Sequence, residues 1–256
     1  IGKQKEFRRK IPWMDDDASG FGDSHANYET QIIAGNTFDY PAVHGEAILK
    51  AGYSFASCSD EAIENQNVML SDYSIVDFIL GKEYQSKIGR EGIKPLEFKT
   101  FTTEMQKAIT DYCHQGGNIF VSGAFVGTDL WDNRHTISLE TDRNFATDIL
   151  KYKWRVGQAS VTGTVKSIVS LFPMLYNGDF TFHNTLNSDS YVVEAPDAIE
   201  PASEGAYTIL RYSENNLSAG IAYKGDYKTV VIGFPFESIK SAFDRMKMMK
   251  MVLDFF

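Results

Sequence analysis

Basic residues are scarce in this sequence, and so are the features that would bind polyanions. Lys and Arg number 25 against 34 Asp and Glu, which gives a formal net charge of -9 at pH 7. Nucleic acids and anionic membranes are bound through clustered Lys and Arg that displace counterions. The composition therefore argues against both partners, and we interpret the one basic cluster, the opening GKQKEFRRK, as a solvated arm.

Long apolar runs are absent as well. No run approaches the roughly 20 residues that cross a bilayer, so we predict no membrane-spanning segment. No signal peptide precedes Ile1 and the first residue is not Met, which leads us to expect a processed or excised part of a longer polypeptide. With 43% hydrophobic residues among 256, the chain can bury a sizeable core, and we expect residues 1–256 to form a single domain.

Cysteine is too rare for a disulfide framework. The two cysteines, Cys58 and Cys113, lack the C-x-x-C spacing of a metal or redox site, and we expect both to be buried thiols. The five histidines show neither H-x-x-x-H nor H-E-x-x-H spacing, so we predict no metal site and no cofactor.

A strand-then-helix rhythm runs through the first half of the chain. Apolar periodicity predicts helices over 41–51 and 103–113, and four short strands at Gln31–Ala34, Tyr53–Ser57, Ile75–Leu80 and Asn118–Val121. We interpret the polar stretch from Gly81 to Thr100 as a loop. Strands that alternate with helices at this spacing indicate right-handed crossovers and a parallel sheet.

The second half changes to short β-branched and aromatic runs separated by Pro and Gly turns. We predict strands at 154–156, 164–165, 180–182, 191–193 and 208–210, within an antiparallel β-rich extension over residues 152–225. A last strand at 229–233 precedes a helix with an inner stripe of seven residues: Ala242, Phe243, Met246, Met249, Val252, Leu253 and Phe256.

The predicted fold class is therefore α/β. The sheet is expected to be mainly parallel, with helices on both faces as in a three-layer sandwich, and to continue into the antiparallel extension. Residues 1–27 are expected to form an N-terminal arm or loop.

The stretch NIFVSGAFVGTDLW, residues 118–131, predicts a buried strand that runs into a glycine turn with the spacing of a nucleophile elbow. Phe125 stands where a hydrolase would place Ser or Cys. In open parallel sheets, ligands bind beyond the carboxyl ends of the strands. Three segments are expected to meet there: 35–44, 81–83 and 123–127.

Two motifs carry a resemblance to a known family. Gly123-Ala124-Phe125-Val126-Gly127 after a strand resembles the G-x-C-x-G elbow of class I glutamine amidotransferase-like domains, which have a flavodoxin-like fold. Phe234-Pro235-Phe236-Glu237 resembles the Phe-His-Pro-Glu segment of that family, and Gly81 resembles its oxyanion-hole glycine. The resemblance covers most of the chain from about Gln31 and implies a flavodoxin-like sandwich.

The departures from that family concern its chemistry. Phe125 stands at the position of the nucleophile and Pro235 at that of the general base, so that only Glu237 of the acidic partner is kept. Acyl transfer of this type needs a nucleophile, an adjacent base and a group that orients the base. We therefore predict no amidotransferase activity, and Glu237 is either a structural carboxylate or a ligand-binding one.

A narrower resemblance involves Ala34–Pro41, His44-Gly45 and Gly52–Phe55. These residues are similar to an amidotransferase-like module of large secreted bacterial proteins that are often labelled xanthan lyase. The resemblance implies a secreted or cell-envelope location, neighbouring domains in the same polypeptide, and carbohydrate as a possible partner.

Two functions follow as expectations. The first is a non-catalytic module that serves as a scaffold or contacts carbohydrate or protein. The alternative is a polysaccharide lyase or hydrolase that uses the carboxylates Glu83, Asp129 and Glu237, since carboxylate pairs perform acid-base chemistry on sugars.

The expected ligand cleft lies at the carboxyl edge of the sheet and is lined by eight residues: Asn36, Asp39, His44, Gly81, Glu83, Phe125, Asp129 and Trp131. His44 falls in the first turn of a helix, where the helix N-terminus would lower its pKa and favour a neutral ring. The other interpretation of His44 is a surface residue beside the helix cap.

Overall fold

The fold is described by a computed structural model that covers residues 5–8, 31–37, 40–83, 86–88, 96–98, 100–131, 139–168, 178–185 and 191–256. For residues 5–8, 31–37, 86–88 and 96–98 the description is limited to the backbone. Within these ranges, none of the helices has the length and apolar character to cross a membrane.

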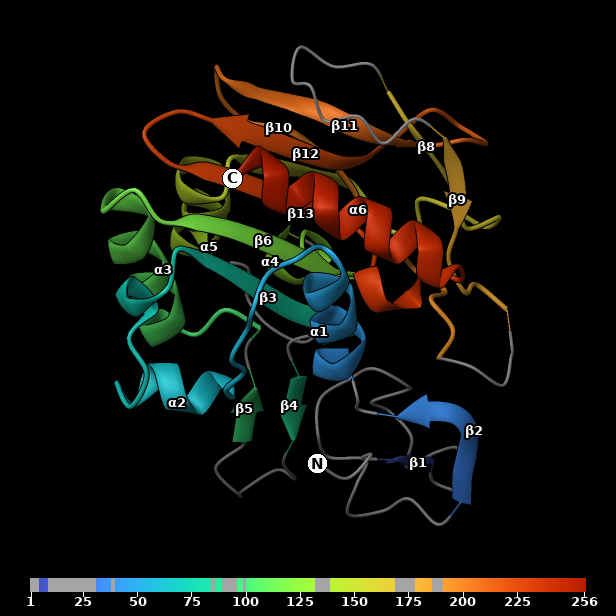
Figure 1. Ribbon diagram of the computed structural model, residues 1–256, viewed down its shortest axis with the longest axis horizontal. Helices are drawn as coiled ribbons and strands as arrows, with labels where there is room; N and C mark the ends of the chain where they lie inside the picture. Colours follow the sequence, from blue (N-terminus) through green and yellow to red (C-terminus); the bar gives the residue numbers. More distant parts are fainter. Residues whose placement is uncertain are drawn as a thin grey trace.

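A curled, mixed sheet of seven strands forms the centre of the molecule (Figure 1). In spatial order its strands are β3 (Ile75–Gly81), β6 (Asn118–Gly123), β13 (Lys228–Ile232), β12 (Ser218–Lys224), β11 (Ala206–Tyr212), β8 (Thr164–Ser167) and β9 (Asp179–Thr181). The outer edge of β9 is bridged by the chain that follows β13, where the Lys240 N–H donates to the Thr181 carbonyl at 2.9 Å. This contact bends the antiparallel end of the sheet back towards the middle.

The predicted fold class is wrong. Only β3–β6 and β6–β13 pair in parallel, whereas the other four strand pairs of the sheet are antiparallel. The result is a curled mixed sheet and not a mainly parallel, flavodoxin-like sandwich. The physical reason is the connections: β11, β12 and β13 are joined by tight hairpins, and hairpins impose antiparallel pairing.

Several expected strands pair elsewhere or do not form. β2 (Gln31–Thr37) pairs with β1 (Lys5–Arg8) in a separate two-stranded sheet, and neither 53–57 nor 191–193 is a strand. Two further pairs stand apart from the main sheet: β7 (Tyr152–Val156) with β10 (Ala198–Pro201), and β4 (Ser86–Ile88) with β5 (Leu96–Phe98). The latter hairpin lies inside the predicted loop. Apart from β1, the expected arm over 1–27 lies outside the described residues.

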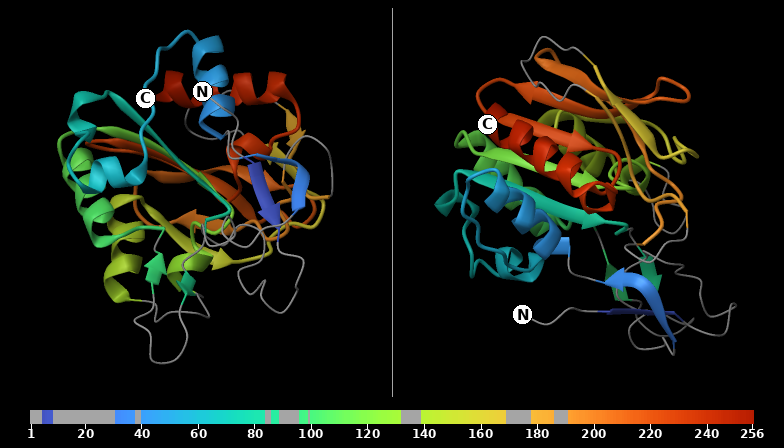
Figure 2. Two further views of the ribbon diagram at one scale, coloured as in Figure 1. Left: turned by 90° about the horizontal axis from the view of Figure 1, so that it is seen from below. Right: turned by 45° about the vertical axis from the view of Figure 1, so that its right-hand side comes forward.

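Helices cover both faces of the sheet (Figure 2). Successive side chains of β6 alternate between the two apolar layers, as Ile119 and Phe120 do. One layer is closed by α1 (Tyr40–Lys50) and α6 (Ala242–Phe255), the other by α3 (Thr103–His114) and η4 (Phe145–Ile149). The described residues also form five short helices: α2 (Asp60–Glu64), η3 (Leu70–Asp72), α4 (Thr128–Trp131), α5 (Glu140–Asn144) and η5 (Phe236–Ser238).

Of the local predictions, the helix over 103–113 is confirmed, whereas those for Cys58 and Phe243 are wrong. The helix predicted over 103–113 forms as α3, and its N-cap is Thr102, whose hydroxyl accepts from the Met105 N–H at 3.1 Å. Cys113 is buried as predicted, but Cys58 is exposed because residues 52–61 lie at the surface instead of forming a buried strand. On α6, Phe243 is 62% exposed and does not belong to the inner stripe.

The strand-to-helix turn over 118–131 is confirmed. β6 ends at Gly123, and residues 124–127 form a turn that leads into α4 (Thr128–Trp131). Phe125 is half-buried in this turn. Beside the turn, the chain after β13 packs tightly against Asp197, because a Cβ added to Gly233 would lie 2.0 Å from the Asp197 carbonyl oxygen.

This close approach predicts that Gly233→Ala lowers the free energy of unfolding by about 1–3 kcal/mol or more, since backbone must move to admit the methyl group. Gly225→Ala is the control. Its added Cβ meets mainly the ring and hydroxyl end of the Tyr223 side chain, which can turn away. Urea unfolding followed by circular dichroism should separate the two variants, and equal midpoints would contradict the packing argument.

Candidate functional site

The carboxylate of Asp197 holds the turn that follows β6. One oxygen accepts from the backbone N–H groups of Gly127 and Thr128, both at 2.7 Å. The other accepts from the Thr128 hydroxyl at 2.5 Å and the Trp154 indole N–H at 3.3 Å. Asp197 is fully buried, so the protein satisfies these four donors internally.

Burial raises the pKa of Asp197 to about 7, while the hydrogen bonds from Thr128, Gly127 and Trp154 act in the opposite direction. Backbone N–H groups at an elbow stabilise an oxyanion when a substrate binds there. At this turn, two of the N–H groups that follow Phe125 already bind a carboxylate of the protein. The arrangement is chemically that of an occupied anion site.

Phe125 and Trp131 point into different apolar layers. Phe125 packs against the layer under α1 and α6, whereas Trp131 packs against the layer under α3. The Trp131 ring lies 6.1 Å from that of Tyr152, centroid to centroid. The two rings therefore support the two sides of the turn separately.

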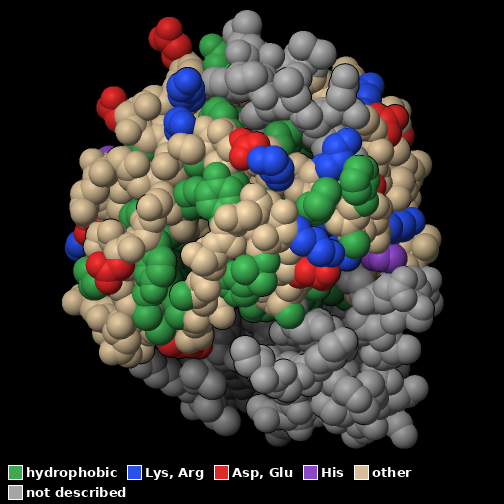
Figure 3. All heavy atoms as spheres, viewed as in Figure 1, with side chains coloured by type: hydrophobic (Ala, Val, Ile, Leu, Met, Phe, Trp, Pro, Cys, Tyr) green, Lys and Arg blue, Asp and Glu red, His purple; other side chains and the backbone are tan. Residues whose placement is uncertain are grey.

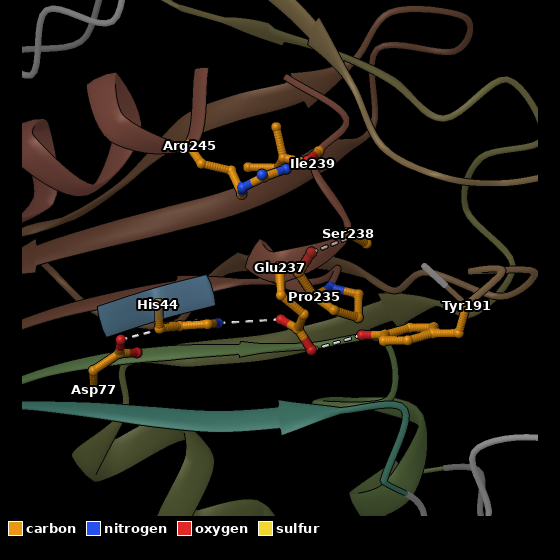
Figure 4. A network of polar contacts seen from close by, with 8 residues as sticks. All are labelled: His44, Asp77, Tyr191, Pro235, Glu237, Ser238, Ile239 and Arg245. Carbon is orange, nitrogen blue, oxygen red and sulfur yellow. Dashed lines mark hydrogen bonds and ion pairs between the residues drawn. The ribbon is translucent and has the colours of Figure 1, made fainter. Parts of the chain in front are cut away.

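Four polar side chains, three of them buried and Asp77 partly buried, form a connected row from the middle of β3 towards the carboxyl ends of the parallel strands (Figure 4). His44 Nδ1 is 2.7 Å from Asp77 Oδ2, and His44 Nε2 is 3.2 Å from Glu237 Oε2. The Tyr191 hydroxyl donates to Glu237 Oε1 at 2.7 Å. The exposed fraction of the side chain is 1% for His44, 14% for Asp77 and 2% for Glu237.

We call these four side chains the His44 cluster. Each of them comes from a different part of the fold. His44 lies on α1, Asp77 on β3, Glu237 on η5, and Tyr191 in the segment before β10. Aromatic rings close it off from solvent, with Phe236 4.6 Å from the imidazole and Tyr40 5.2 Å from Tyr191. The cluster ties α1 to the sheet.

His44 is charged in this setting. Burial would lower its pKa, but the two carboxylates outweigh that effect, Asp77 more than Glu237, and raise the pKa to about 9. Both ring nitrogens can then donate, one to each carboxylate. The expected neutral ring is wrong because the two carboxylates outweigh both burial and the helix N-terminus, and the expected surface position is wrong because the side chain is buried.

Gly81 supports the same cluster from β3. Its φ is 56°, and an added Cβ would lie 3.0 Å from the Tyr40 ring and 3.3 Å from Glu237 Oε1. Next to it, the Lys82 ammonium is buried and donates to the Val192 carbonyl at 2.7 Å and to Glu194 at 2.5 Å. The position that resembles an oxyanion-hole glycine is therefore filled by neighbouring side chains.

The remaining predicted site residues are dispersed. Glu83 follows β3 and is partly exposed, and Asp129 is buried on α4. Asn36 lies in β2, where only the backbone is described, and Asp39 lies outside the described residues. Of the expected cleft, the structure brings His44 and Gly81 together, and Glu237 joins them.

Three residues of the site were missed from the sequence. Asp77 carried a signal, since it is a lone charge inside the apolar run Ile75–Leu80. Tyr191 was assigned to a strand, and Asp197 carried no signal beyond its place after Pro196. Within the described ranges, no three His, Cys, Asp or Glu side chains are arranged to hold a metal ion.

Comparisons with known proteins define the fold only. No protein-family model matches the sequence, and no curated protein matches it either. A beta-galactosidase from Rahnella sp. R3 is similar in structure, with a TM-score of 0.52 and 12% identity over 84% of this chain and 26% of that chain. The chain thus spans about a quarter of the length of that protein.

Two further structures are less similar. The N-terminal domain of mmIFT52 matches with a TM-score of 0.49 and 15% identity over 84% of this chain and 86% of that chain. The exo-beta-1,4-mannosidase Op5Man5 from Opitutaceae bacterium strain TAV5 matches with a TM-score of 0.34 and 12% identity over 53% and 19%. These two matches are too weak to support an argument about this chain.

Replacing His44 tests the cluster. His44→Ala leaves two buried carboxylates without their cation, and we expect it to lower the free energy of unfolding by about 3–5 kcal/mol. The folded-state pKa of about 9 lies above the ordinary 6.5, so the stabilisation is fully present below pH 6.5 and is lost as pH rises through about 9.

Urea unfolding at about pH 6 and about pH 9.5 should therefore show a large difference between wild type and His44→Ala that shrinks at the higher pH. Glu46→Ala on the exposed side of the same helix is the control, and removes one pair with Lys50 worth about 0.5 kcal/mol. A difference that grows with pH would refute a charged His44.

Replacing Asp197 tests the turn. Asp197→Ala leaves buried donors unpaired, and we expect a loss of about 3 kcal/mol or more, partly restored by formate, which can enter the vacated position. Glu214→Ala is a matched control, because that carboxylate also accepts from two backbone N–H groups, at Val161 and Thr162, but at the surface. Water can replace it there, so a cost equal to that of Asp197→Ala would contradict our account.

Proposed function

We propose that this chain is a non-catalytic contact module of a longer polypeptide, in which the elbow and Glu237 are kept for structural reasons. The observation that carries the proposal is the state of the turn after β6. Phe125 occupies the position of a nucleophile, and the N–H groups of Gly127 and Thr128 are bound by Asp197. A site without a nucleophile and without a free anion-binding turn has no route to acyl transfer.

The fold of the beta-galactosidase chain supports a module of this kind. The matching region makes up 26% of that chain, so a fold of this type occurs there as one part of a longer protein. The likeness to class I glutamine amidotransferase-like domains stays a prediction. The same holds for the secreted or cell-envelope location and for contact with carbohydrate or with neighbouring domains.

A polysaccharide lyase or hydrolase is less well supported. Hydrolysis of sugars by carboxylates needs two accessible carboxyl groups about 5–10 Å apart, and a lyase that used these carboxylates would also need them to be accessible. Glu237 has 2% of its side chain exposed and binds His44 and Tyr191 with its two oxygens, and Asp129 is 1% exposed. Of the three candidate carboxylates, Glu83 alone is more than slightly exposed.

The proposal predicts no release of ammonia from glutamine above the uncatalysed background, measured on purified protein beside an active amidotransferase. Alkylation of Cys58 should leave the melting temperature unchanged, because that thiol is exposed, whereas Cys113 should react only on unfolding. Turnover that disappears in Cys58→Ser or Cys113→Ser would overturn the proposal.

The enzymatic alternative has its own test. Neutral and acidic polysaccharides, xanthan among them, are incubated with wild type and with Glu237→Gln, and new reducing ends and unsaturated products are measured. We expect no products from either protein and a lower melting temperature for the variant. Product formation by wild type that is lost in a folded Glu237→Gln protein would establish the alternative.

A further inference from the structure

The outer face of α1 and α6 carries apolar side chains that the fold leaves exposed. The two helices lie side by side on one face of the sheet (Figures 1 and 2). Leu49 on α1 is 59% exposed and Phe243 on α6 is 62% exposed. Just beyond α1, Tyr53 and Phe55 are 39% and 44% exposed, and the Phe55 ring lies against Gly45.

This face also differs in charge from the rest of the molecule. Residues 40–50 and 240–256 contain five basic and three acidic residues, a net charge of +2 in a chain whose total is -9, so that the remainder carries -11. Figure 3, which looks onto this face, shows Lys and Arg among hydrophobic side chains. The apolar side chains therefore lie on two segments with a net positive charge, in a protein whose total charge is negative.

Two of the three acidic side chains of the face are paired within their own helices. Glu46 binds Lys50 at 2.6 Å, and Asp254 binds Lys250 at 2.8 Å. The Lys247 ammonium lies 5.3 Å from the centre of the exposed Phe243 ring. A partner would thus meet apolar surface beside an excess of cations.

We propose that the outer face of α1 and α6 docks an amphipathic helix whose apolar stripe is flanked by Asp and Glu. A third helix can pack on a pair of adjacent helices by fitting its side chains between the rows of side chains on their surfaces. Leu49 and Phe243 supply the apolar contact, and the net charge of +2 selects acidic over basic flanks. This inference builds on the proposed contact role and names the chemistry of the partner.

The test uses two synthetic helical peptides with identical Leu stripes, one with Glu and one with Lys at the flanking positions. Fluorescence anisotropy should show binding of the Glu peptide, weaker binding as salt is added, and affinity for the Lys peptide lower by about tenfold or more. Equal binding of the two peptides, or binding of neither, would overturn the proposal.

Variants locate the site. We expect the affinity for the Glu peptide to fall by about tenfold in the double variant Leu49→Ser with Phe243→Ser, and by about as much in Lys247→Glu. Melting curves should confirm that both variants fold. Val161→Ser is the control, since Val161 is 80% exposed on a loop that belongs to neither helix. If Val161→Ser lowered the affinity for the Glu peptide as much as the other variants do, the peptide would not bind specifically at α1 and α6, which would contradict the proposal.

Sedimentation of the protein alone separates a second copy from an acidic helix as the occupant. Self-association that Leu49→Ser with Phe243→Ser abolishes would assign the face to a dimer and overturn the proposal. Glutaminase and polysaccharide assays on the same preparations test the proposed non-catalytic function separately. If the peptides do not bind but these assays show no activity, the docking proposal fails and the proposed function stands.

Discussion

One buried carboxylate connects the two halves of this fold. Asp197 binds the turn after β6 through its side chain, while its backbone N–H donates to the Gly233 carbonyl at 2.7 Å. Its own carbonyl accepts from the Tyr212 hydroxyl, also at 2.7 Å. The parallel strands, the end of β13 and the antiparallel strand β11 are thus fixed relative to one another at a single residue, and the position of the turn depends on it.

Asp197 and the His44 cluster follow the same physical rule. A buried charge is tolerated when the oxygens and N–H groups around it have partners. Both oxygens of Asp197 and both oxygens of Glu237 accept hydrogen bonds, whereas Asp77 uses one oxygen for His44 and its Oδ1 is buried without a partner. The elbow N–H groups bind Asp197, and Glu237 binds His44 and Tyr191. In both places, groups at the edge of the sheet are used for contacts within the protein.

The sequence predicted what short-range patterns determine. β3, α3 and the strand-turn-helix over 118–131 were found because their apolar periodicity, caps and glycines lie within a few residues. Pairing could not be found in this way. The antiparallel sense of β12 was predicted, but the pairing of β13 with β6 and the partner of β2 depend on contacts that no local window contains. The site could not be predicted for the same reason. Gly127 and Asp197 are 70 residues apart in the sequence, and His44 and Glu237 are 193 residues apart.

The separation of 193 residues between His44 and Glu237 affects the order in which parts of the fold can form. Hairpins such as β11–β12 close short loops and form early, whereas contacts between distant residues bear a larger loop-closure cost. During synthesis α1 leaves the ribosome long before η5, so His44 waits for its second carboxylate until nearly the whole chain has been made. Until then Asp77 is its one acidic partner in the cluster, and we expect the docking of α1, which also contacts α6 and η5, to be completed late in folding.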